Sequence, residues 1–172
     1  MIKYRSAVLL ATSVLLIATL GCGAKDKRPE GFPKLYPITV QINNNGQPFS
    51  GAGVRFETND GAQYSIVGTT DEMGKAVLET AMGSYFAAGC PLGTFKVTIN
   101  KFDREELDKL VEQQKNLPPQ VEDLKLAAKI TQLEDNMKPL VPKKLLRADT
   151  TPIDVTVDES STEFTFDVNE YK

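Results

Sequence analysis

The chain has 172 residues, 41% of them hydrophobic and 25% charged, which is the composition of a globular protein and excludes a disordered or multispanning one. It contains no histidine, so it lacks the commonest general base, the Ser-His and Cys-His nucleophile systems and most zinc or copper sites. The formal net charge is −3 and there is no basic cluster, which argues against binding to nucleic acid. We therefore expect a protein that is not an enzyme and uses no metal or cofactor.

Residues 1–21 have the features of an export leader. Lys3 and Arg5 precede an apolar run over residues 7–20, and the small residue Gly21 precedes a possible cleavage point. The run is shorter than the roughly 20 apolar residues that a membrane-spanning helix needs. We expect residues 1–21 to be a signal peptide that is removed. An ordinary secretory leader and an uncleaved membrane anchor are the alternatives.

The leader ends in a sequence that resembles the lipobox of bacterial lipoproteins, Leu-(Ala/Ser/Thr)-(Gly/Ala)-Cys. The residues are Thr19-Leu20-Gly21-Cys22, which depart from the pattern at Thr19 and Leu20. The resemblance implies that the Cys22 thiol carries diacylglycerol and that the protein is held in the cell envelope by covalent lipid. Two acyl chains hold a protein stably on a membrane. Gly23 stands where aspartate would imply retention in the inner membrane, so we expect the outer membrane.

Residues 22–35 are polar and contain two prolines and two glycines after Cys22, without an apolar period, and we expect a flexible tether. The alternative is that Phe32 and Leu35 pack on the edge of the domain.

Residues 36–172 are dominated by period-two alternation of apolar and polar side chains, the pattern of half-buried strands. It predicts strands over 38–42, 54–57, 95–99, 153–157 and 164–168, with shorter ones near 63–68 and 75–80. Turn sequences separate them: Asn45-Gly46 favours a tight hairpin, 71–74 a second turn, and 158–161 is expected to close the final pair. We expect a mainly β protein, a β-sandwich of about seven strands.

Three stretches in this region share a recognisable pattern: GQPFSGAGV at 46–54, TDEMGKAVL at 70–78 and PLGTFKVTI at 91–99. Together they resemble the carboxypeptidase-regulatory-like domains, which share a transthyretin-like (prealbumin-like) Greek-key sandwich. The segments TTPI at 150–153 and FTF at 164–166 are similar to small bacterial envelope lipoproteins with one such domain. The resemblance implies an accessory or binding module without catalytic residues.

Between 102 and 142 the pattern changes to helical, which places a two-helix insertion before the last two strands. Asp103 and Glu106 resemble a capping box for a helix that ends at Pro118-Pro119. A second helix is expected from about 120 to 137, with an apolar stripe of Leu126, Ile130, Leu133 and Met137, widened by Val121, Leu124, Ala127 and Ala128. Either the helices fold back over a sheet, or they form a hairpin that binds an envelope protein partner.

The remaining chemically notable residues have structural interpretations. Cys90 is expected to be a small, half-buried apolar residue, with a reactive or intermolecular thiol as the alternative. Asp60, Asp71 and Glu72 are expected to be solvated turn acids, and Ser50 and Ser84 have no histidine partner. We therefore expect a non-enzymatic, lipid-anchored envelope module that acts in structure or in protein or ligand binding. The alternative is an accessory module that recognises peptide or glycan for a secreted enzyme or transport system.

Overall fold

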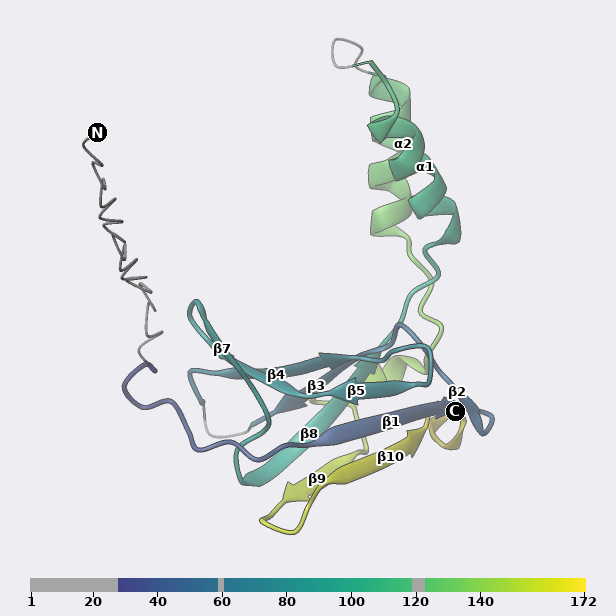
Figure 1. The fold of residues 1–172 in the computed structure, drawn as a ribbon. Coiled ribbons are helices and arrows are strands. Elements are labelled where there is room, and N and C mark those ends of the chain that lie inside the picture. The colour runs from purple at the N-terminus through teal and green to yellow at the C-terminus, as the bar shows by residue number, and fades with distance from the viewer. Residues whose placement is uncertain (1–27, 59–60, 119–122) are drawn as a thin grey trace, which may run out of the picture.

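The computed structural model describes residues 28–58, 61–118 and 123–172 and is mainly β, with two sheets and two α-helices (Figure 1). The first sheet has β1 at its centre. Its strands are β1 (Thr39–Asn44), β2 (Gln47–Pro48), β5 (Lys75–Val77) and β10 (Glu163–Asp167). Strand β1 pairs antiparallel with β2 and β5 and parallel with β10. The first and last strands of the domain are therefore neighbours.

The second sheet has six strands in the order β7-β6-β4-β3-β8-β9, and every pair in it is antiparallel. The strands are β3 (Gly53–Glu57), β4 (Ser65–Thr69), β6 (Glu79–Met82), β7 (Tyr85–Ala88), β8 (Gly93–Asn100) and β9 (Asp154–Val157). The two edges of this sheet are β7 and β9. The longest strand, β8, has eight residues and lies beside β3 and β9.

One hydrophobic core lies between the two sheets. Alternate residues of β1, Val40 and Ile42, face Val54 and Phe56 of β3 and the β8 residues in a single buried cluster. Burial of these side chains accounts for most of the stability that such a domain can have. The predicted burial of alternate residues is confirmed in β1, β3, β9 and the start of β8, but Thr98 of β8, expected to be exposed, is buried as well.

Two of the expected strand arrangements are wrong. The segment expected as one strand near 75–80 changes sheets: β5 pairs with β1 and β6 pairs with β4, with the buried Leu78 between them. The turn at 158–161 does not close a hairpin, because β9 pairs with β8 and β10 pairs with β1. Strand β7 was not expected, because Tyr85-Phe86-Ala87-Ala88 shows no alternation of apolar and polar residues.

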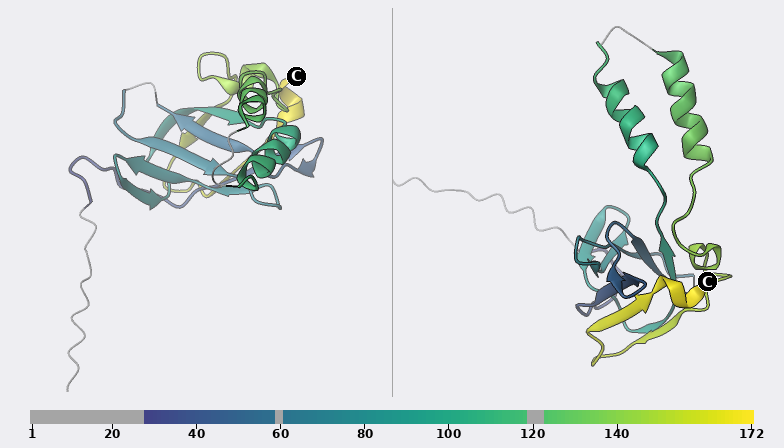
Figure 2. Two further views of the ribbon diagram at one scale, coloured as in Figure 1. Left: turned by 90° about the horizontal axis from the view of Figure 1, so that it is seen from above. Right: turned by 90° about the vertical axis from the view of Figure 1, so that its right-hand side faces the viewer.

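The insertion forms a hairpin of α1 (Glu105–Lys115) and α2 (Leu124–Asp135), placed before the last two strands as predicted. The hairpin projects away from the sheets, as Figure 1 and the right-hand view of Figure 2 show. The predicted cap is wrong: Arg104, not Asp103, is the N-cap of α1, and the Asp103 carboxylate only accepts a long hydrogen bond from the Glu105 N–H at 3.3 Å. For α2, the Asp123 carboxylate accepts from the N–H groups of Lys125 and Leu126, as an N-cap does.

Candidate functional site

The helical hairpin has a small hydrophobic core of its own, separate from the core between the sheets. Leu107 of α1 packs with Leu126 and Ile130 of α2, and Leu133 and Met137 are half-buried against them. The predicted stripe is therefore confirmed, but it is buried between the two helices and not against a sheet. The expected widening is only partial: Leu124 is 76% exposed and Ala128 is also exposed, whereas Val121 lies outside the described residues.

The base of the hairpin is joined by backbone hydrogen bonds between its two legs. The Asp103 N–H donates to the Lys138 carbonyl at 3.0 Å, and the Leu140 N–H donates to the Lys101 carbonyl at 2.8 Å. Phe102 and Pro139 form a β-bridge between them. Beyond this ladder the chain rejoins the main core, where Val141 is buried. The free part of the insertion is therefore 104–137, shorter than the expected 102–142.

Charged side chains cover the outside of the hairpin. Glu106 of α1 and Lys129 of α2 form an ion pair across the two helices at 3.0 Å. Along α1, Lys109 lies 2.7 Å from Glu105 and lowers the pKa of that carboxyl. An open hollow of about 430 Å³ lies between the first turn of α1 and the end of α2, where Leu133 and Met137 line it together with charged residues. Such a surface, with charged residues around a partly apolar hollow, can bind a folded partner.

The N-terminal segment meets the domain far from the hairpin. Phe32 is buried against the edge strand β7, with its ring edge-to-face on Tyr85 at 4.8 Å between centroids. Tyr36 then exchanges two backbone hydrogen bonds with Cys90, just before β8 begins. The chain is thus packed from Phe32 onward, in agreement with the alternative for the end of the tether. Cys22 and the leader lie outside the described residues.

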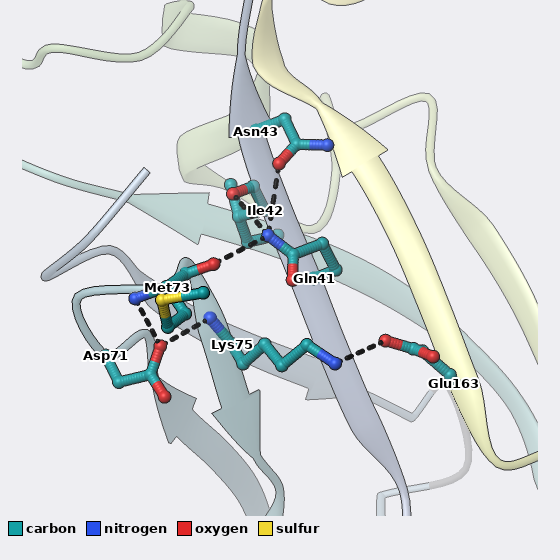
Figure 3. Close-up of polar contacts among 7 residues, drawn as sticks. All are labelled: Gln41, Ile42, Asn43, Asp71, Met73, Lys75 and Glu163. Carbon is teal, nitrogen blue, oxygen red and sulfur yellow. Dashed lines mark hydrogen bonds and ion pairs between the residues drawn. The ribbon is translucent and has the colours of Figure 1, made fainter. Parts of the chain in front are cut away.

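The turn at 70–74, with the sequence Thr-Asp-Glu-Met-Gly, is held against β1 by a cluster of polar contacts (Figure 3). The Asp71 carboxylate accepts from the N–H groups of Met73 and Lys75, at 2.8 and 2.9 Å. The Gln41 side chain of β1 donates to the Met73 carbonyl at 3.0 Å. Lys75 reaches across β1 to Glu163 of β10 at 3.4 Å. The cluster therefore ties three segments of the first sheet together, and its acids stabilise structure.

Thr70 connects this motif to the Gly-x-Pro motif before it. Its buried hydroxyl donates to the Phe49 carbonyl at 2.7 Å and accepts from the Ala52 N–H at 2.8 Å. Gly74 is equally constrained, because its φ is +75° and a Cβ there would lie 2.6 Å from the Ile42 carbonyl oxygen. The residues that carry the family resemblance thus have structural tasks. Sequence patterns identified the motifs but not these contacts.

Cys90 is fully buried, more so than expected, and burial raises the pKa of its thiol to about 12. Its Sγ lies 3.4 Å from the Pro91 carbonyl oxygen. Because the thiolate is the reactive form, this thiol is inert at neutral pH. Glu72 is exposed, whereas Asp60 lies outside the described residues.

Over the described ranges, no group of three or more potential ligands is placed to hold a metal ion. In the same part of the chain, neither helix has the length and apolarity needed to cross a bilayer. Ser50 and Ser84 are exposed and lie on separate turns. No family model, curated protein or solved structure matches this chain.

Proposed function

We propose that the protein is a non-enzymatic, lipid-anchored module of the bacterial cell envelope that holds its helical hairpin toward a protein partner. The observation that carries the proposal is the position of the hairpin. It stands clear of both sheets on a base ladder, and the described part of the hairpin has three buried core residues, Leu107, Leu126 and Ile130. The described residues of the two helices contribute nothing to the main core, so the hairpin does not serve to stabilise the sheets. Binding of a partner would explain why it projects.

The anchor and the hairpin would lie at opposite ends of β8. Tyr36 bridges to Cys90 just before the first residue of β8, and the hairpin follows Asn100, its last residue. Eight strand residues separate these ends by roughly 23 Å, and the helices extend for about 18 Å more. With lipid on Cys22, the domain would therefore act as a spacer that keeps the hairpin off the membrane surface.

We further infer that the domain is of the transthyretin-like, carboxypeptidase-regulatory-like type. The three motifs support this assignment, since each occupies a turn or strand that organises the sheets. The Gly-x-Pro and Thr-Asp motifs are joined by the Thr70 hydroxyl, and Phe95 of the third motif packs on Phe56 with centroids 5.8 Å apart. Domains of this type serve as accessory or binding modules, which fits the proposed role.

The test is capture of envelope proteins by the full-length lipidated chain and by a variant in which an Asn-Gly turn replaces 104–137. This deletion retains the ladder at Asp103 and Lys138 and the buried Val141. We expect one stoichiometric partner with the full chain and none with the variant, while the unfolding transition of the sheets is unchanged. A partner that both forms retain would contradict the proposal. Enrichment of glycan without a protein partner would favour the accessory module that recognises glycan.

The lipid anchor is tested separately by labelling with palmitate. Cys22→Ser should abolish the label, and Cys90→Ala is the matched control that should keep it. Thiol counting gives a second measurement, because the chain has two cysteines. The lipidated protein should react with no thiol reagent when folded and at one site when unfolded, since only Cys90 then becomes accessible. A second reactive thiol would contradict lipidation.

A further inference from the structure

The edge strand β7 is unusual for an exposed sheet edge because it has no charged residue. Its sequence is Tyr85-Phe86-Ala87-Ala88, and its free edge is not covered by another strand of the described chain. Soluble proteins commonly protect such edges with charges, especially lysine. Phe86 is 66% exposed and lies opposite Ala81 of β6. On the same face Ala88 lies opposite the exposed Glu79, so this face is apolar around Phe86 with one carboxylate beside it.

The same strand is where the N-terminal segment is fixed to the domain. The Phe32 ring packs on Tyr85, and the Arg28 guanidinium lies over Phe32 at 5.3 Å from the ring centroid. Only nine residues lie between Cys22 and Phe32, so the ten Cα-to-Cα steps span at most about 35 Å when fully extended. A lipid on Cys22 therefore allows β7 to reach the head groups of the bilayer and limits its distance from them to about this length.

We propose that the β6–β7 hairpin, with Phe86 foremost, is the surface through which the domain lies on the bilayer that holds its anchor. The proposal rests on lipid attachment at Cys22. Aromatic side chains are favoured at the boundary between head groups and acyl chains. Phe86 is the one aromatic residue of the described ranges that is exposed, and it follows Tyr85, on which Phe32 packs. This contact would give the anchored domain a defined orientation, with the helical hairpin at the opposite end of the domain from β7 (Figure 1).

The absence of tryptophan from the chain allows a direct test. Phe86→Trp places a single fluorescent reporter at the proposed contact, and Leu124→Trp places one at an equally exposed position on α2. Both lipidated proteins are bound to phosphatidylcholine vesicles with plain or brominated acyl chains. We expect brominated lipid to reduce the emission of the Phe86→Trp protein about twofold or more, with protection from acrylamide, because the indole enters the interface. The Leu124→Trp protein should respond to acrylamide alone.

Flotation of the vesicles separates the possible failures. A protein that does not float contradicts lipid anchoring, and this proposal with it. If the Phe86→Trp protein floats but is quenched by acrylamide and not by brominated lipid, the membrane contact alone is overturned. If its indole is shielded from both quenchers, β7 is covered by protein, as in pairing with a second copy across its free edge, and the membrane contact is again overturned.

Discussion

The Thr70 hydroxyl donates a hydrogen bond to the carbonyl oxygen of Phe49, 2.7 Å away. The hydroxyl oxygen also accepts from the Ala52 N–H, so one buried side chain satisfies two backbone groups of the preceding turn. An isosteric replacement that removes the hydroxyl leaves both groups without this partner in a buried position. Their desolvation, and not the loss of packing, then determines the cost.

Thr70→Val should therefore lower the free energy of unfolding by roughly 2–4 kcal/mol, from two unsatisfied backbone groups. Thr69→Val is the matched control, because Thr69 is exposed on β4, and it should change stability by less than about 0.5 kcal/mol. Urea unfolding followed by far-UV circular dichroism measures both. Equal midpoints for the two variants would show that the Thr70 hydroxyl has no such role.

Gly74 and Gly83 both have positive φ, but only Gly74 is closely approached by other backbone. Gly83→Ala should cost about 1 kcal/mol from backbone strain alone, because nothing lies within 4 Å of the added Cβ. Gly74→Ala adds collisions with the Ile42 carbonyl oxygen and the Phe49 nitrogen, and should cost about 3 kcal/mol or more. The difference between the two melting temperatures reports the close approach. Similar losses would mean that the turn moves freely off β1.

The small core of the hairpin predicts local unfolding. Ile130→Ala removes one of the three buried side chains in the described part of this core. The free energy of unfolding of the hairpin should fall by about 2 kcal/mol, which is enough to unfold a short helix pair that has little stability of its own. We expect amide hydrogens of α1 and α2 to lose protection while those of β8 keep theirs. Leu124→Ala, at an exposed position of the same helix, should leave exchange unchanged. Loss of protection throughout β8 would show that the hairpin and the sheets unfold together.

Asp167 should make the protein sensitive to acid. The N–H groups of Asn169 and then of Gly46 donate to its carboxylate and lower its pKa. A carboxyl with a lowered pKa in the folded state stabilises the protein above its unfolded pKa, and this contribution is lost as the pH falls through the folded value. The loss should occur below about pH 4. Asp167→Asn should flatten the decline of the urea midpoint in this range, and parallel profiles would contradict the assignment.

The sequence predicted most of the strands because each has one buried face, and alternation records that face directly. Alternation is insufficient at Leu78, where the chain passes from one sheet to the other. The alternation of apolar and polar residues continues across this point, so the pattern predicts one strand over 75–80 instead of β5 and β6. Strand β7 could not be found because Phe86 is exposed where an apolar residue is expected to be buried. The apolar stripe of α2 was evident, but its partner was not, since Leu126 fits a facing helix as well as a sheet.

The candidate sites divide in the same way. Cys90 was expected to be half-buried, because a free cysteine behaves as a small apolar residue, and it is fully buried. The pairing of Phe32 with Tyr85 joins segments distant in sequence, and no local pattern encodes it. The role of Thr70 was equally hidden, because a threonine in a turn is ordinarily solvated.

The parallel pairing of β1 with β10 sets the order in which the domain can fold. Asn45, in the turn after β1, contacts Asp167, 122 residues later in the chain. Because a polypeptide is synthesised from its N-terminus, the first sheet cannot be completed until residues 163–167 of β10 are available. Such distant contacts slow folding, because a long loop is closed before any pairing compensates for it. The first sheet should thus form only after β10 has been synthesised or transported.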